Sequence, residues 1–256
     1  MYIRPGHAEY DLRILRRIVK ENPLGIFTTV ITSPSFPLLQ STHIPFVLDV
    51  EDESSENELG RLRGHLARQN PQSKAIIEDI ISRQTSDKCI RTLEHDVLVL
   101  FSSPVHHYVT PKFYTETKPT TGKVVPTWNY SAVQVYGKAT VYIDSKSDET
   151  STFLGQQIHD LSEYNERVTM GFTGQGDKPG PWKVTDAPER YIDLLKKAII
   201  GVEITIEKME GKFKMSQEMS NGDIDGVIRG FDRLGTETGR ELAKTVKERK
   251  EIKNNK

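Results

Sequence analysis

The chain has 256 residues and a net charge of −1, with 35 lysines and arginines against 36 aspartates and glutamates. This length can bury a sizeable core in one large domain or two small ones, while the near-neutral charge gives no general attraction for nucleic-acid phosphates. The longest apolar run, at 97–101, is too short to cross a bilayer. The single cysteine, Cys89, excludes an intrachain disulfide, and the first residues lack the apolar segment of a signal peptide. We therefore expect a cytoplasmic protein with no membrane segment, and a nuclear location stays open.

The first hundred residues are predicted to hold a helix, three strands, a second helix and a fourth strand. These elements are expected at residues 11–20, 25–31, 38–50, 62–66, 70–81 and 97–101. Apolar residues at helical spacing define the first helix, and β-branched residues define the first strand. Pro45 indicates an edge, an end or a bulge in the second strand because it cannot donate a ladder hydrogen bond. The unbroken apolar run at 97–101 predicts a strand buried on both faces.

The remaining elements are irregularly spaced. A long loop with one aromatic turn is expected at 104–126, a strand or a bent pair of strands at 128–143, a helix at 148–164 and a glycine-rich segment at 171–180. A further helix starts at 186–189 with Asp186 as its cap, and a strand, a turn and a last short strand follow at 202–207, 210–211 and 212–215. Strands that cluster before residue 145 and resume at 202 do not alternate regularly with helices. The sequence therefore favours a mainly β, α+β fold, an antiparallel barrel with appended helices, over a doubly wound sheet.

Cationic and polar residues surround the predicted start of the helix at 70–81. Arg68 could reach a phosphate placed near this helix N-terminus, or it could be a surface arginine that pairs with the acidic loop at 51–58. Lys74, one turn into the helix, is either a second cationic ligand or a solvated lysine. His65, on the preceding strand, either contacts a ligand or makes one structural hydrogen bond.

Further candidates lie on other predicted strands. Thr42 and His43 interrupt an apolar pattern, which either a polar ligand or a bulge explains. Trp128 either stacks on a flat ring or packs in the core. A polar end to the last strand holds two alternating lysines, as an exposed edge also does; it consists of Lys212, Lys214, Ser216 and Gln217.

Several site types are absent from the sequence. Adjacent histidines on a strand point to opposite faces, so His106 and His107 do not readily chelate one metal, and a zinc site is not expected. The sequence has no dinucleotide-binding Gly-x-Gly-x-x-Gly after a strand, no P-loop and no Gly-x-Ser-x-Gly elbow. No catalytic acid or base stands out.

The sequence contains three specific motifs, which occur in a fixed order along the chain. They are Gly-His-Leu-Ala-Arg-Gln-Asn-Pro at 64–71, Thr-Gly-Lys-Val-Val-Pro-Thr-Trp-Asn-Tyr at 121–130 and Gly-Lys-Phe-Lys-Met-Ser-Gln at 211–217. The chain closely resembles the PaiB family, described as FMN-binding negative transcriptional regulators, over residues 1–231. The resemblance implies a split β-barrel, a homodimer and an FMN site shared across the dimer interface. On the positions of this sequence it implies cofactor contacts from Thr42, His43, Ile44, His65, Leu66, Ala67, Arg68, Asn70, Lys74, Trp128, Asn129, Lys212, Lys214, Ser216 and Gln217.

Two positions depart from the family pattern. Ser73 stands where the family usually has tryptophan, and Glu218-Met219 stands where it usually has Asn-Arg. The second change removes a cation and adds an acid, which weakens any anion contact there. We expect an FMN-binding split-barrel domain with helical insertions at 1–235 and a charged helical tail at 236–256, whose last 17 residues carry seven basic and three acidic side chains.

The resemblance leaves three functions open. The first is a flavoprotein dimer with flavin-dependent redox activity on a small substrate. The second is a non-catalytic transcriptional regulator that senses flavin or redox state. The third is a haem-binding split-barrel protein. Because the chain carries no basic excess outside its tail, we place flavin binding ahead of direct DNA contact.

Overall fold

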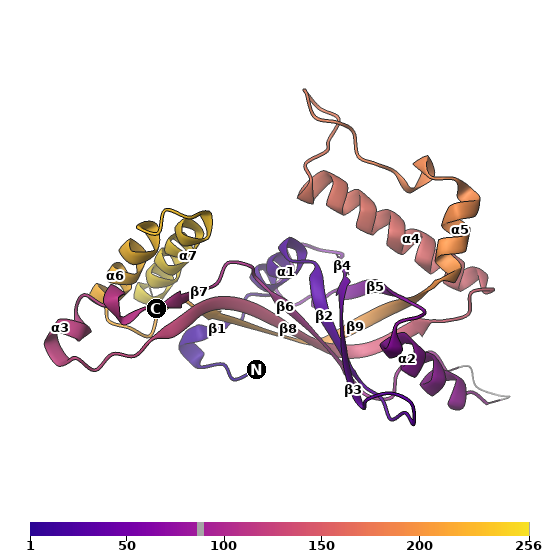
Figure 1. Cartoon of the computed structure of the whole chain (residues 1–256), viewed down its shortest axis with the longest axis horizontal. Helices are drawn as coiled ribbons and strands as arrows, with labels where there is room; N and C mark the ends of the chain where they lie inside the picture. Colours follow the sequence, from indigo (N-terminus) through magenta and orange to yellow (C-terminus); the bar gives the residue numbers. More distant parts are fainter. Residues whose placement is uncertain (86–89, 256) are drawn as a thin grey trace. The chain divides into compact units, whose positions relative to one another are not determined.

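The computed structural model describes residues 1–85 and 90–255, so Cys89 lies outside the described residues. The chain forms two compact units (Figure 1). The terminal unit comprises Met1–Ile18, Phe101–Gln134 and Glu210–Lys256, and the barrel unit comprises Val19–Leu100 and Val135–Met209. Two long strands, β8 (Thr127–Tyr142) and β9 (Ile199–Lys214), contribute residues to both units.

The barrel unit is a curled antiparallel sheet. Its strands follow the order β3-β2-β6-β8-β9-β5-β4, where the shorter strands are β2 (Leu24–Val30), β3 (Leu39–Pro45), β4 (Val47–Asp49), β5 (Arg61–Ala67) and β6 (Val97–Ser102). The first and last strands of this order, β3 and β4, are consecutive in the chain and separated by Phe46 alone. Pro45 ends β3, and the Phe46 amide donates to the Pro23 carbonyl at 2.9 Å. The predicted antiparallel barrel with appended helices is confirmed.

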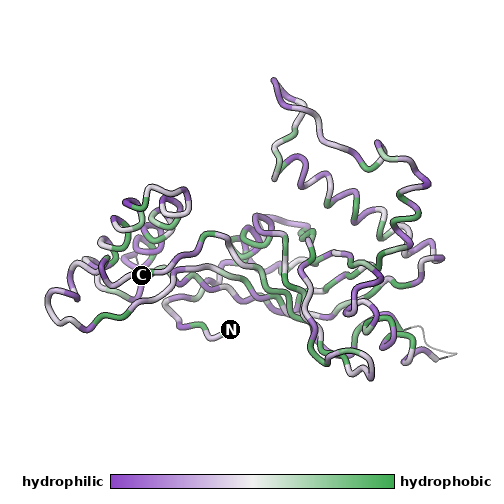
Figure 2. Tube along the Cα trace, in the orientation of Figure 1, coloured by the Kyte–Doolittle hydropathy of each residue, from purple (hydrophilic) through white to green (hydrophobic). Residues whose placement is uncertain are grey.

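Alternation of side chains along each strand builds the barrel core. On β9, Ile200, Val202 and Ile204 are completely buried. On β6, Val97 and Val99 are buried whereas Leu98 and Leu100 are only half-buried, so the prediction of a strand buried on both faces is wrong. Figure 2 shows apolar residues gathered along the barrel strands, whereas helix α4 (Asp148–Tyr164) alternates between apolar and polar turns.

The barrel unit contains the helices α2 (Pro71–Ser82), α4 and α5 (Glu189–Lys197). The Arg63 guanidinium joins β5 to α4 because it donates to both carboxylate oxygens of Asp49 and, at 2.8 Å, to Asp160. The predicted cap of α5 is wrong. Asp186 ends a short 3-10 turn (Val184–Asp186) and accepts from the Lys183 amide, and α5 begins after Pro188.

The terminal unit is built around the outer ends of β8 and β9. It contains η1 (Pro5–His7), β1 (Ala8–Glu9), the start of α1 (Leu12–Glu21), β7 (His107–Val109), η2 (Pro111–Phe113), α3 (Thr117–Thr121), α6 (Asn221–Asp232) and α7 (Glu237–Asn254). β1 pairs with β9, and β7 pairs with the start of β8. The loop predicted at 104–126 therefore contains regular elements, which its proline and threonine content concealed.

The turn predicted at 210–211 is also wrong, because β9 continues through Gly211. A Cβ atom at this position would lie 2.1 Å from Cδ2 of Leu15, so glycine permits the close approach of α1 rather than a turn. Beyond β9, α6 and α7 pack against each other through Val227, Leu242 and Val246 among other buried residues. Among the described residues, no helix is long and apolar enough to cross a membrane.

Candidate functional site

The predicted site residues fall into two groups, one in each unit. In the barrel unit, three lie along β3: Thr42 is half-buried, His43 is exposed and Ile44 is part of the core. On β5, Leu66 is also a core residue and Ala67 is exposed. Ile44 and Leu66 thus contribute to barrel packing.

Arg68 directs its guanidinium at the main chain. Its Nη2 atom donates to the Ile143 carbonyl at 2.6 Å and to the Ile199 carbonyl at 3.4 Å, and its Nε atom donates to the Lys197 carbonyl at 3.3 Å. These carbonyls lie where β8 has just ended and β9 begins. Arg68 therefore ties strand ends together, and pairing with the acidic loop at 51–58 is not among its contacts in the structure.

Asn70 begins α2 as the sequence predicts. Its side-chain oxygen accepts from the Gln72 amide at 2.9 Å, which is the hydrogen bond of an N-cap, and its amide nitrogen donates to Thr42 at 3.1 Å. This second contact brings two predicted site residues together. Lys74, one turn further on, is exposed to solvent.

His65 presents an unused polar atom. Burial lowers the pKa of its imidazole, which favours the neutral ring. Its Nδ1 atom is buried and has no hydrogen-bond partner among the described residues. The ring therefore keeps a hydrogen-bonding atom that the fold itself does not satisfy.

In the terminal unit, the two lysines at the end of β9 lie on one strand face. The Lys214 ammonium donates to the Thr127 hydroxyl and, at 3.0 Å, to the Trp128 carbonyl. Lys212 donates to the Tyr2 carbonyl at 3.0 Å and lies 5.2 Å from the centre of the Tyr130 ring. The alternation of β9 therefore brings both cations to the same region.

The turn after β9 is fixed by its own side chains. Gln217 accepts from the Met215 amide at 2.6 Å and donates to the Phe213 carbonyl at 2.5 Å. Ser216 adopts a left-handed backbone with φ of 62°, and its hydroxyl donates to Oδ1 of Asn129 at 3.1 Å. Asn129 is completely buried, and its Nδ2 atom has no partner among the described residues. This amide is a second polar group that the fold leaves unsatisfied.

Trp128 lies at the surface, with 52% of its area exposed. Its ring makes an edge contact with Tyr108 and a tilted contact with His106, at centroid distances of 6.2 and 6.0 Å. Core packing is therefore not its role, and an exposed indole face stays open to a flat ring. His107 instead contacts Phe231. In the described part of the chain, no group of three or more metal-ligating side chains is placed to hold a metal ion.

A pocket of about 350 Å³, here called the terminal pocket, opens beside the two lysines. The N-terminal segment, the start of β8, the end of β9 and the turn after it contribute its walls, with Tyr2, Arg4, His7, Val125, Pro126, Thr127, Lys212, Lys214, Glu218 and Met219. Sequence reasoning did not single out Arg4, His7 and Glu218 as site residues. Glu218 could have been found because it replaces the family's usual residue at this position. The sequence around Arg4 and His7 contains no motif or periodicity that indicates a binding site.

Glu218 links the charged groups of the terminal pocket. Its carboxylate lies 3.0 Å from Nε2 of the buried His7 and 3.8 Å from Nζ of Lys214. Burial acts to raise the pKa of Glu218, but hydrogen bonds from its own backbone amide and His7, together with the Lys214 charge, lower this pKa below its usual range. The pocket therefore contains a carboxylate held in its ionised form.

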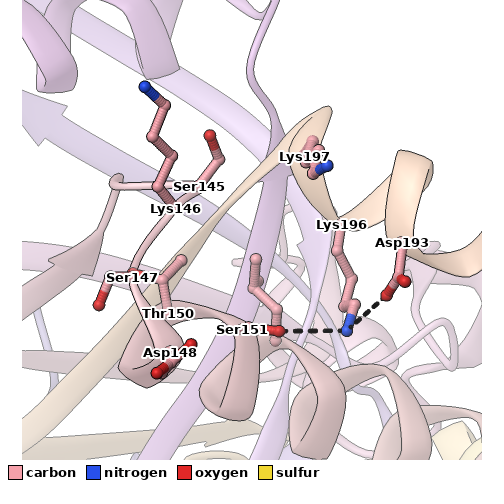
Figure 3. A pocket seen from close by; sticks show the side chains of 10 residues that line it. Ser145, Lys146, Ser147, Asp148, Thr150, Ser151, Asp193, Lys196 and Lys197 are labelled. Carbon is pink, nitrogen blue, oxygen red and sulfur yellow. Dashed lines mark hydrogen bonds and ion pairs between the residues drawn. The ribbon is translucent and has the colours of Figure 1, made fainter.

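A second pocket, of similar volume, lies between the start of α4 and the end of α5 in the barrel unit (Figure 3). Lys196 lines it and contacts Asp193 at 3.1 Å and Ser151 at 3.2 Å. Lys146 and Lys197 are exposed at its edge. None of the predicted site residues lines this α4–α5 pocket.

The barrel and the polar strand ends define a split-barrel protein with two candidate binding regions. Residues 1–208 match the family described as "Putative FMN-binding domain", and the chain belongs to this family. An uncharacterized protein of Aspergillus fumigatus is 58% identical over the full length of both chains. The Bacillus subtilis protein named "Protease synthase and sporulation protein PAI 2" is 26% identical over 97% of this chain and 98% of its own. Among solved structures, the conserved hypothetical protein Rv2991 of Mycobacterium tuberculosis has a TM-score of 0.47 and 12% identity, over 86% of this chain and 95% of that one.

The family match supports a flavin cofactor. The haem alternative finds no support in it. The assignment of individual residues to the cofactor stays a prediction, as do the homodimer and the boundary of the charged tail at residue 236.

Proposed function

We propose that this protein is an FMN-binding flavoprotein. The observation that carries the proposal is the unsatisfied amide of Asn129, which lies in the second family motif, is completely buried and is bonded on its other side to Ser216 of the third motif. A buried donor without a partner costs free energy unless a ligand supplies an acceptor. The uracil-like edge of a flavin ring supplies carbonyl acceptors of this kind.

Both groups of motif residues suit parts of FMN. Lys212 and Lys214 supply cationic donors for a phosphate, the exposed face of Trp128 suits stacking, and Nδ1 of His65 is a second unsatisfied polar atom. Arg68 fits a phosphate contact less directly because its guanidinium already bonds three main-chain carbonyls. Bound FMN would supply hydride or single-electron transfer, while these residues would bind and orient it.

In this proposal the FMN site is shared between two copies of the chain, as the family resemblance implies. The predicted contacts divide between the two units of the chain. A redox activity on a small substrate and a sensory role in regulation both remain compatible with such a site.

Direct DNA binding has weaker support. Of the basic residues in the tail, Arg249 pairs with Glu9 at 2.5 Å and Lys250 pairs with Asp225 at 2.6 Å. These pairs reduce the positive charge that α7 offers to phosphates. A regulatory role, if present, would then act through flavin or through another protein rather than through a basic face of this helix.

The absorption spectrum of the purified protein tests the proposal. Peaks at about 375 and 450 nm, with FMN identified by mass after release, are expected because these bands belong to the flavin itself. Apoprotein should also quench FMN fluorescence on titration, and Asn129→Ala should weaken this binding about tenfold through the lost amide contact. A Soret band, or a protein that binds no FMN, would refute the proposal.

A further inference from the structure

The terminal pocket gathers positive charges that repel one another. Lys212 is only 9% exposed, and the Lys214 side chain is 19% exposed. Burial lowers the pKa of Lys214 most strongly, Glu218 opposes this effect, and the charges of Lys212 and Arg4 lower the pKa further. Lys212 and Arg4 therefore lie close enough to Lys214 to disfavour the protonated, charged form of its amine. Such an arrangement is unfavourable unless an anion compensates it.

The donors of these cations are only partly used. The Lys214 ammonium donates hydrogen bonds to the Thr127 hydroxyl and the Trp128 carbonyl, and it forms an ion pair with Glu218 at 3.8 Å. Lys212 has one hydrogen bond, to the Tyr2 carbonyl, and an ammonium group carries three donors. The Arg4 side chain makes no hydrogen bond or ion pair with another residue in the part of the chain that the structure describes. Lys212 and Arg4 thus keep donors for a ligand.

Glu218 sets the charge of the pocket. Three cations, Arg4, Lys212 and Lys214, less the one carboxylate leave a charge of +2. A phosphate monoester carries about −1.5 to −2 at neutral pH, which matches this value better than a single carboxylate does. The hydrogen bond with the buried His7 holds the Glu218 carboxylate in place, so the negative charge that partly neutralises the three cations has a fixed position.

We propose that the terminal pocket binds the phosphate group of a phosphate monoester and that Glu218 limits its affinity for this dianion. The phosphate has two sources. It is either that of FMN, in which case the inference rests on the proposed function, or that of a separate phosphate-bearing substrate or effector. Lys212 and Arg4 bind the oxygens, and Lys214 contributes charge.

Calorimetric titration with inorganic phosphate at constant ionic strength tests the site. Lys212→Met and Arg4→Gln should each weaken phosphate binding about tenfold, because each removes a charged donor. Glu218→Gln should strengthen it severalfold, since it removes the opposing charge and keeps an oxygen that can accept from His7. Lys244→Met, at an exposed position of α7, is the matched control and should leave binding unchanged. Arg4 is exposed, so its variant stays informative even if Lys212→Met fails to fold.

Repeating the titration with FMN and with riboflavin separates the two sources. If FMN abolishes phosphate binding and riboflavin does not, the pocket holds the FMN phosphate. If phosphate binds equally well to protein saturated with FMN, it belongs to a separate ligand. Absence of phosphate binding, or binding that neither Arg4→Gln nor Glu218→Gln changes, overturns the inference. A protein that binds phosphate through these residues but binds no FMN refutes the proposed function alone.

Discussion

The motifs at 64–71 and 211–217 both place cations at a strand end, yet the two units use them differently. In the barrel unit, the Arg68 guanidinium bonds main-chain carbonyls, and Asn70 caps a helix. In the terminal unit, Lys212 and Lys214 line a pocket beside a third cation. The contrast teaches that the acceptors which the fold places around a motif cation decide how many of its donors are used by the main chain.

The two pockets sharpen the same point. Each has a volume of about 350 Å³ and includes lysines in its walls. In the α4–α5 pocket, Lys196 pairs with Asp193, and the other two lysines are exposed, so the charges are solvated or neutralised (Figure 3). In the terminal pocket the lysines are largely buried and repel one another. Burial of like charge, rather than volume, distinguishes the terminal pocket from the α4–α5 pocket.

The largest effect is expected for Arg68→Met. Loss of three hydrogen bonds from a charged donor to main-chain carbonyls should lower the free energy of unfolding by about 2–3 kcal/mol. Urea titration followed by tryptophan fluorescence measures this change. Lys74→Met, in the same region but exposed, should stay within about 0.5 kcal/mol of the wild type. Equal stability of the two variants would mean that Arg68 does not hold the strand ends together.

The hydrogen-bond partners of Arg68 could not be predicted from the sequence, whereas most elements could. Periodicity and caps predicted most elements, including the start of α2 at Asn70, because these depend on neighbouring residues. Alternation along a strand predicted that Lys212 and Lys214 would share one face. The partners of Arg68 could not be predicted, since they are carbonyls about 75 and 130 residues away along the chain. The contribution of Arg4 and His7 to the terminal pocket likewise depends on the pairing of β1 with β9.

A smaller effect, which disappears at acidic pH, is expected for Asp223→Asn in the terminal unit. Asp223 is buried and accepts from the Glu116 and Thr117 amides. Burial acts to raise the pKa of Asp223, but hydrogen bonds from Thr117, Glu116 and Ser220 lower it below its usual range. Its stabilisation is therefore complete above the unfolded-state pKa of about 3.9 and is lost as pH falls through the lower folded-state pKa.

The variant should thus be less stable than wild type by about 1–2 kcal/mol at pH 7, and the difference should shrink below pH 4. Urea titrations of both proteins at pH 7 and pH 3 measure it. A difference that stays constant with pH would show that the charge of Asp223 is unimportant to the loop at 116–117.

The smallest effect is expected for Lys214→Met, the direct counterpart of Arg68→Met. The variant loses bonds to Thr127 and the Trp128 carbonyl but removes a buried cation that its neighbours repel, so its stability should change by less than about 1 kcal/mol. The same urea titration measures the change. A loss as large as that of Arg68→Met would make Lys214 a structural cation and would remove the contrast between the two motifs.

The place of β9 inside the sheet also constrains the order of folding. β5 pairs with β9 in a register that joins Arg61 to Thr205 and Ala67 to Ile199, so this pairing cannot form until synthesis has passed residue 199. Until then the inner edge of β5 has no neighbour, while β2 and β3 can pair as soon as they emerge. The same late strand supplies Lys212 and Lys214, and β1 cannot pair until this strand has been synthesised. A ribosome-bound chain therefore carries an unpaired strand edge from the synthesis of β5 until that of β9, and the barrel and the terminal pocket both depend on the same late strand.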